Sequence, residues 1–225
     1  MSPSQKTVPA AAQTIKIVLT GGGSGGHITP LLPLARALKS KDPTCQLIYI
    51  GLRGEKIAVA QSFQAVFNKT ARINSGKFRR YHGESWLSHL LDVKTLVLNF
   101  LDMFKVIAGS FQAYRLLGKY KPAVIFSKGG FVVVPVGMAA RLRRIPIVTH
   151  DSDAAAGLAN RIVGRWASLH ATGMPPRYYP YAKDTIIQTG IPVDEHIKPV
   201  NTGLQAQLKR QIGLPPDGLM LLVTG

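Results

Sequence analysis

A glycine-rich run at residues 21–26 (GGGSGG) lies between a short apolar segment and a stretch with helical spacing. The segment before it, residues 15–20 (IKIVLT), is rich in β-branched side chains, as is typical of a strand buried in a parallel sheet. Glycine allows a tight turn and a close backbone approach between such a strand and the helix that follows. The run therefore predicts the first βα unit of a doubly wound parallel sheet.

The same order of strand, turn and helix recurs along the chain. The expected further strands are residues 46–50, 66–70, 123–127, 146–149, 169–172 and 185–189. The expected helices are residues 27–39, 86–118, a segment ending near 143, and 157–166. Alternating helices and apolar strands predict the α/β class, with a Rossmann-like, doubly wound parallel sheet.

Three segments are expected in the domain organisation. Residues 1–14 lack an apolar core segment and are interpreted as a disordered tail. Residues 15–195 form the α/β domain, and residues 196–225 hold a linker, a short helix ending near 213 and a fresh apolar strand at 219–224. Because a lone strand cannot bury itself, this last strand suggests a second domain that is truncated.

The glycine run is also the strongest candidate for a binding site. Glycine amides after a strand and before a helix favour phosphate or pyrophosphate, which predicts contacts from Gly22, Gly23, Ser24, Gly25 and Gly26. A dinucleotide site needs an acid at the end of the second strand, and none occurs before Glu55. A P-loop needs Gly-Lys-Ser/Thr where this chain has Gly-His-Ile. Neither NAD nor ATP is the expected ligand, and the alternative is a turn that serves packing alone.

Polar residues at three strand ends are expected to share one cleft. His27 follows the first glycine run, where a helix N-terminus disfavours its protonated form and leaves it available as a base. Asp151 is the fallback base, although it and Asp153 are equally suited to capping the next helix. The remaining candidates for contact with the ligand are Lys128, Gly129, Gly130, Phe131, Asp153 and Asn160, the last of which is alternatively an ordinary surface residue.

The charge of the chain favours an anionic partner. Lys and Arg number 28 against 11 Asp and Glu, a formal net charge of +17. Such an excess suits a lipid surface, a pyrophosphate substrate or nucleic acid, or serves solubility alone. No basic-aromatic platform or recognition helix is evident, so nucleic acid is not the expected partner. Cys45 is the only cysteine, which excludes an intramolecular disulfide.

The apolar stretch at residues 86–107 suggests contact with a membrane surface. Its apolar side chains are worth roughly −6 kcal/mol for insertion, which its four charged residues outweigh at roughly +2.5 to +3.5 kcal/mol each. It is therefore not expected to span a bilayer. Its polar residues recur with helical spacing along one narrow stripe. We expect docking on an anionic membrane through this helix together with Lys77, Arg79, Arg80 and Trp86, or else a helix that is simply part of the core.

Several runs resemble a known family in the same order. TGGGSGGHITPLLPLARAL, SGKFRRY and the segment from KPAVIFSKGGF to GLANRI are similar to segments of the MurG family, glycosyltransferase family 28. TGIPV near residue 189 resembles the family's Gly-Asn-Pro-Val run. The resemblance covers residues 15–225 but only the first half of the family's length. This chain departs from the family at His150-Asp151-Ser152-Asp153, where members usually read His-Glu-Gln-Asn, at Phe131, usually Tyr, and at Ile191, usually Asn.

The resemblance implies a fold and an activity. It implies the acceptor-binding N-terminal domain of a GT-B enzyme, with an inverting mechanism and no metal or other cofactor. It further implies transfer of N-acetylglucosamine from UDP-GlcNAc, held by a missing C-terminal domain, to undecaprenyl-pyrophosphoryl-MurNAc-pentapeptide (lipid I). The product, lipid II, serves peptidoglycan synthesis at the cytoplasmic face of the plasma membrane. An alternative is the acceptor subunit of a two-chain lipid-linked transferase, against which the unfinished last strand argues.

Overall fold

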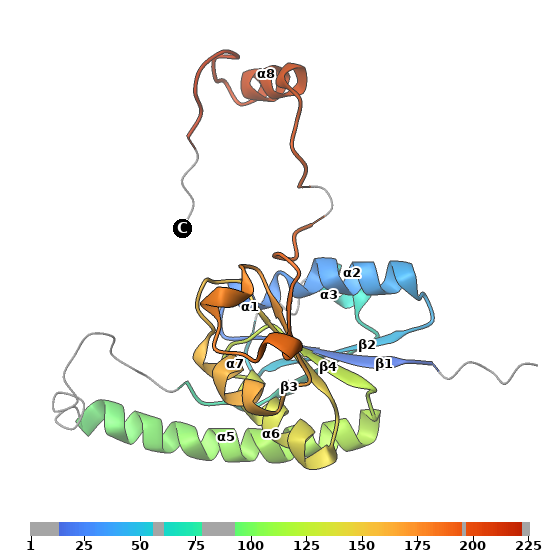
Figure 1. Ribbon diagram of the computed structural model, residues 1–225, viewed down its shortest axis with the longest axis vertical. Coiled ribbons are helices and arrows are strands. Elements are labelled where there is room, and N and C mark those ends of the chain that lie inside the picture. Colours follow the sequence, from blue (N-terminus) through green and yellow to red (C-terminus); the bar gives the residue numbers. More distant parts are fainter. Residues whose placement is uncertain (1–13, 56–60, 78–92, 195–196, 222–225) are drawn as a thin grey trace, which may run out of the picture. The chain divides into compact units, whose positions relative to one another are not determined.

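The computed structural model describes residues 14–55, 61–77, 93–194 and 197–221 (Figure 1). The chain divides into two compact units, Met1–Pro192 and Val193–Gly225. Each unit is described by itself below. The first contains the sheet and every candidate site residue that the structure describes.

The first unit is built on a seven-stranded sheet in which every pair of neighbours is parallel. The strands follow the order β3-β2-β1-β4-β5-β6-β7. Their bounds are β1 Lys16–Thr20, β2 Gln46–Leu52, β3 Lys69–Ile73, β4 Val124–Ser127, β5 Ile147–Asp151, β6 Leu169–Thr172 and β7 Ile186–Gln188. The predicted doubly wound parallel sheet is confirmed.

Helices cover both faces of this sheet (Figure 1). One layer holds α1 (Gly25–Ile28), α2 (Leu31–Lys41) and α3 (Gln61–Val66), and the other holds α5 (Val93–Tyr120), α6 (Val133–Arg143) and α7 (Leu158–Val163). Short 3-10 turns lie at Gly164–Trp166, Pro176–Tyr178 and Lys183–Thr185. Successive strand residues point to opposite faces, so Val18 packs in the α5–α6 layer and Leu19 in the α2–α3 layer. The two apolar cores are therefore separated by the sheet.

The strand order reverses direction at β1, which creates the position where a site is expected. β1 pairs with β2 on one side and with β4 on the other, and Thr20 is in register with Ser127. The glycine-rich loops that follow β1 and β4 consequently begin side by side at one edge. Open parallel sheets bind ligands in the crevice at such a point.

Two sequence expectations need correction, and a third is tested only in part. The helix expected at 27–39 is divided into α1 and α2, because Pro30 has no amide hydrogen with which to continue α1 and stands at the N-cap of α2. The strand expected at 66–70 is misplaced by three residues: Val66 ends α3, Phe67 packs into the core, and the strand is β3. The long helix is described from Val93 onward, and residues 86–92 of the predicted helix lie outside the described residues.

Two residues of the polar stripe of α5 face the protein, and much of the apolar surface of the helix faces outward. Thr95 and Asp102 are 6% and 3% exposed, respectively. Large apolar side chains that are exposed on the same helix are Leu96, Val97, Phe100, Leu101, Met103, Phe104, Ile107 and Phe111. Thr95–Tyr120 is also long and apolar enough to cross a membrane by length and composition alone. The C-terminal half of the helix packs through Ala113 and Leu117 into the sheet core.

The second unit contains one described helix, α8 (Thr202–Gln211). Asn201 caps it by accepting a hydrogen bond from the Leu204 amide at 2.8 Å. The strand expected at 219–224 is not formed over its described part, Leu219–Leu221, and its remainder lies outside the described residues. No strand is described in this unit that could pair with it, and an unpaired strand is not stable.

Candidate functional site

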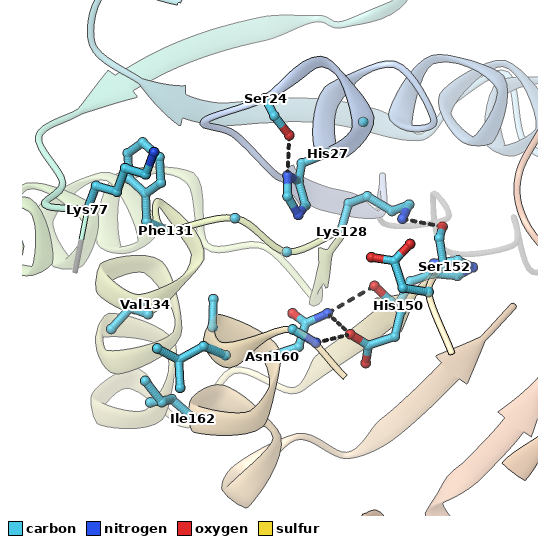
Figure 2. A pocket seen from close by; sticks show the side chains of 18 of the residues that line it. Ser24, His27, Lys77, Lys128, Phe131, Val134, His150, Ser152, Asn160 and Ile162 are labelled. Carbon is cyan, nitrogen blue, oxygen red and sulfur yellow. Dashed lines mark hydrogen bonds between the residues drawn. The ribbon is translucent and has the colours of Figure 1, made fainter. Parts of the chain in front are cut away.

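A cavity of about 540 Å³ opens where the ends of β1, β4 and β5 meet (Figure 2). Its lining comes from both glycine loops, from the segment after β3, from the end of β5 and from α7. The residues are Ser24, Gly26, His27, Gly76, Lys77, Lys128–Phe131, Val134, His150–Asp153, Gly157–Asn160 and Ile162. Chain segments more than a hundred residues apart thus form one site, as the strand-end argument predicted.

In loop 1, residues 21–26, some of the glycines are required because neighbouring groups pack closely against them. A Cβ on Gly23 would overlap the ring of Phe131, and one on Gly22 would crowd Glu55. Glu55 Oε1 accepts a hydrogen bond from the Gly23 amide at 2.9 Å. Gly22, Gly23 and Gly25 are not among the residues that line the cavity, whereas Ser24 and Gly26 are. Contacts from those three glycines to a ligand stay a prediction.

His27 stands on loop 1 with one ring nitrogen turned towards the cavity (Figure 2). Nδ1 lies 2.7 Å from Ser24 Oγ. When Nδ1 carries the proton and donates it to Ser24, Nε2 is left as an acceptor on the cavity side. Burial, and secondly the charge of Lys128, lower the pKa of His27 below its ordinary value. A neutral imidazole is therefore the dominant form at neutral pH, and a neutral imidazole is what general-base chemistry requires.

Loop 2, residues 128–131, carries a buried cation and unused amides. Lys128 is 4% exposed, and its Nζ donates to Ser152 Oγ at 2.7 Å. Burial lowers the pKa of Lys128, and Asp151 and Asp153 oppose that shift. Gly129 and Gly130 have φ of +98° and +83°, which glycine adopts without strain. Within the part of the chain that the structure describes, the amides of residues 129–131 donate to no acceptor, and they precede the N-terminus of α6.

Asp151 is held by three hydrogen bonds and is 5% exposed. Its Oδ1 accepts from the Gly157 amide at 3.1 Å and from Asn160 Nδ2 at 3.0 Å, while Oδ2 accepts from Tyr181 at 2.8 Å. Asn160 is 2% exposed and also bonds His150 O and Ser127 Oγ. Both residues thus tie the ends of β4 and β5 to α7. This is the geometry of residues that fix a site, and a role for Asp151 as base stays a prediction.

The other predicted site residues divide between the cavity and undescribed segments. The Asp153 side chain is exposed in the cavity lining, so its carboxylate is more accessible than that of Asp151. Lys77, expected on the membrane surface, is exposed and also lines the cavity, so its contact with a membrane stays a prediction. Arg79, Arg80 and Trp86 lie outside the described residues.

The sequence matches the model of a glycosyltransferase family 28 N-terminal domain over residues 17–171. The chain belongs to this family. The resemblance noted in the sequence is thereby confirmed, and the matched region runs from β1 to β6, so it includes every loop that lines the cavity.

Relatives with assigned names lie within the same family. A Clostridium kluyveri protein named UDP-N-acetylglucosamine--N-acetylmuramyl-(pentapeptide) pyrophosphoryl-undecaprenol N-acetylglucosamine transferase is 37% identical over 93% of this chain and 54% of its own length. A Clostridium perfringens protein with the same name is 40% identical over 81% of this chain and 46% of its own length. The chain thus spans about half the length of these curated relatives.

A solved structure supports the family fold. The crystal structure of Acinetobacter baumannii MurG aligns with a TM-score of 0.59 at 22% identity, covering 87% of this chain and 55% of that protein. At this identity the likeness shows the fold alone, namely the Rossmann-like half of a GT-B protein. The matches favour neither the two-chain acceptor subunit nor the nucleic-acid-binding protein considered from the sequence.

Within this family 28 domain, several residues that organise the site were not expected. Glu55 was noted only as an acid too late to hold a ribose, yet it binds loop 1. Tyr181 stacks on His170 with ring centroids 3.6 Å apart and reaches Asp151 across 30 residues. His150 is 1% exposed and its Nε2 lies 2.9 Å from Gly190 O. These contacts arise from tertiary packing, and no local pattern announces them.

Proposed function

We propose that this chain is the acceptor-binding domain of an enzyme that transfers N-acetylglucosamine from UDP-GlcNAc to lipid I, forming lipid II for peptidoglycan synthesis. The observation that carries the proposal is loop 2, where unused amides, a helix N-terminus and buried Lys128 face one cavity. Such an arrangement binds phosphate groups. The names of the clostridial relatives identify a pyrophosphoryl-linked sugar as the molecule on which those proteins act.

His27 is the proposed base for this reaction. The cavity holds the acceptor so that the 4-hydroxyl of its MurNAc approaches His27 Nε2. Nε2 takes the hydroxyl proton as the oxygen forms a bond to the anomeric carbon and UDP leaves from the opposite face, which inverts that centre. Ser24 fixes the required tautomer by accepting from Nδ1. Lys128 is proposed to bind the pyrophosphate of the acceptor, and Asp153, which also lines the cavity, to contact its sugar.

This chain spans about half the length of its relatives, and we propose that the UDP-GlcNAc donor binds in the other half. UDP-GlcNAc would therefore be positioned by a second domain, and residues 1–225 alone are expected to catalyse no transfer. Radiolabelled UDP-GlcNAc incubated with the chain and a soluble lipid I analogue checks this. Measurable product from residues 1–225 would contradict the proposed division of labour.

Binding of the acceptor tests the proposed site directly. Titration of a short-chain lipid I analogue into Lys128→Met should show affinity weakened by about tenfold to a hundredfold, since hydrogen bonds to charged groups contribute about 1.5–3 kcal/mol. Lys119→Met, an exposed lysine in the last turn of α5, is the matched control and should bind as the wild type does. Equal binding by Lys128→Met and Lys119→Met would remove loop 2 from the site.

We further propose that the outer face of α5 docks on the anionic cytoplasmic leaflet, which places the enzyme as a peripheral protein where its lipid acceptor resides. Four aromatic and aliphatic side chains of one patch, Phe100, Leu101, Phe104 and Ile107, are 49–58% exposed. Contiguous apolar surface of this kind marks an interaction site. The excess positive charge of the chain complements anionic lipid. Arg79, Arg80 and Trp86 are proposed to contribute from the segment just before this helix.

Vesicle binding tests the docking surface. Phe100→Ser with Phe104→Ser should weaken sedimentation with phosphatidylglycerol vesicles by at least about tenfold, because burying one Phe is worth about 1.5–3 kcal/mol. Thermal stability should change little, because both rings are exposed. Ile187→Ser on edge strand β7 is the control, since Ile187 is comparably exposed, at 50%. Vesicle binding that the double variant retains in full would exclude this face.

A further inference from the structure

The segment Asn74–Lys77, which we call the strap, connects β3 to the cavity and is fastened along α5. The Asn74 amide donates to Gln112 Oε1 at 2.8 Å, and the Lys77 amide donates to Asp102 Oδ2 at 3.2 Å. Gly76 is buried so closely against Asp102 that a Cβ there would overlap the helix backbone. The strap therefore follows the position of α5 at both of its ends.

The strap also reaches loop 2. Ser75 Oγ donates to Phe131 O at 2.9 Å, and both Gly76 and Lys77 line the cavity. In Figure 2, Lys77 lies towards Phe131 and Lys128 towards Ser152, with His27 between them in the view. The two lysines are thus supplied by different elements and approach the cavity from different sides.

The charges of the lining show why a second cation matters. Among the lining residues that the structure describes, the charged ones are Lys77, Lys128, Asp151 and Asp153. His27 and His150 add no charge at neutral pH, because burial lowers the pKa of each below its ordinary value. Lys128 alone is outnumbered by the two carboxylates. With Lys77 the formal charges of the lining balance, so a ligand with two or more negative charges no longer meets a net negative lining.

We propose that Lys77 is the second cationic ligand of the pyrophosphate group in this cavity, and that Asp102 of α5 is the residue that positions it. This inference rests on the proposed anion-binding function of the cavity. Asp102 is 3% exposed, and its carboxylate holds the Lys77 amide through Oδ2 and Lys105 Nζ through Oδ1 at 2.7 Å. Lys77 is thereby assigned to the cavity instead of the docking surface.

The first experiment separates the cavity from the membrane as the site of Lys77 action. Inorganic pyrophosphate is titrated calorimetrically into residues 1–225, and the same proteins are sedimented with phosphatidylglycerol vesicles that contain no pyrophosphate lipid. Lys77→Gln should bind pyrophosphate about tenfold more weakly, as expected for one lost charge-assisted hydrogen bond, and bind vesicles within about twofold of wild type. Lys105→Gln is the control, because Lys105 bonds the same Asp102 but is not among the cavity-lining residues. Unchanged pyrophosphate binding by Lys77→Gln, or an equal loss in Lys105→Gln, would overturn the assignment.

The second experiment tests positioning by Asp102. Asp102→Asn keeps an oxygen acceptor for the Lys77 amide and should bind pyrophosphate as wild type does, whereas Asp102→Ala should lose as much affinity as Lys77→Gln. In the Lys77→Gln background, Asp102→Ala should cause no further loss, because its effect acts through Lys77. An additive loss in the double variant would show a merely structural role and overturn the positioning claim.

The same titrations distinguish this inference from the function on which it rests. A wild-type chain that binds no pyrophosphate, or Lys128→Met that binds it undiminished, would defeat the anion site and the inference together. A wild-type chain that binds pyrophosphate and loses it in Lys128→Met but not in Lys77→Gln would defeat the inference alone.

Discussion

The two glycine loops of this domain lie side by side, yet they differ in how many backbone amides are available to a ligand. Loop 1 is richer in glycine, but its Gly23 amide is held by Glu55 and its Gly22 and Gly23 accommodate neighbouring groups. Loop 2 has two glycines in positive φ, and its amides remain available beside Lys128. Glycine content therefore reports how closely chain segments approach one another, whereas available amides report where an anion is bound.

The largest expected effect tests what loop 1 does contribute, namely His27. His27→Ala in a complete enzyme containing both domains should lower kcat by about 10²–10⁴, the usual loss for a general base. Lipid I affinity should change much less, because loop 2 provides the anion contacts. Turnover within a few-fold of wild type would remove His27 from catalysis and leave loop 1 a packing element.

The next largest effect is expected on the free energy of unfolding, when the close contact between the two loops is disturbed. A Cβ on Gly130 would overlap the carbonyl oxygen of Gly22, so Gly130→Ala combines backbone strain with a steric clash and should cost at least about 3 kcal/mol in the free energy of unfolding. Gly54→Ala is the matched control, because Gly54 has φ of +89° with no atom within 4 Å of the added Cβ. It should cost about 1–2 kcal/mol through strain alone. Chemical denaturation measures both, and equal losses would deny the close approach.

A smaller effect on pyrophosphate affinity is expected at Glu55, which binds the Gly23 amide of loop 1. Unit charges roughly 10 Å apart in a largely hydrated site interact by about 0.4–0.8 kcal/mol, so Glu55→Gln should bind pyrophosphate about twofold to fourfold more tightly. Added salt should shrink the difference, because screening weakens the repulsion that the variant removes. Calorimetric titration at two ionic strengths measures it. Weaker binding by Glu55→Gln would mean that loop 1 must be held by a carboxylate for loop 2 to function.

The smallest expected effect is a shift in the pKa of His27 in loop 1 when the charge of Lys128 in loop 2 is removed. If neutral His27 is the base, kcat/KM falls as pH drops through the pKa of His27, and that pKa lies below 6.5 because of burial and Lys128. Lys128→Met removes a positive neighbour, which raises the pKa, so the acid limb of the pH–rate profile should move to higher pH. A limb that stays in place would separate the two loops electrostatically.

The sequence predicted the architecture because its signals are local. Buried strands such as Ile147–Asp151 are short β-branched runs, and the carboxyl ends of parallel strands meet at one edge, so the grouping of His27, Lys128 and Asp151 followed from chain order alone. The strand misplaced at 66–70 shows the limit of this reasoning. Val66 and Phe67 are apolar enough for a strand, but they pack with Phe63 around Tyr49 as the end of a helix.

The finer features of the site depend on contacts between distant residues. Glu55 reaches Gly23 across 32 residues, and Lys77 reaches Asp102 across 25. The sequence shows the helical spacing of the polar residues in α5, but this spacing does not reveal which side of the helix packs against the protein. The structure shows it, because Asp102 is buried on the inner side and accepts a hydrogen bond there from the Lys77 amide.

The outward-facing apolar side chains of α5 occupy positions that folding constrains only weakly. Folding is nearly indifferent to exposed positions, where substitutions usually change the free energy of unfolding by less than about 0.5 kcal/mol. Phe100, Phe104 and Ile107 stand at such positions, each more than half exposed. Random substitution constrained by folding alone would replace them with polar residues over time. The proposed contact with a membrane would account for their apolar character, which the fold itself does not require.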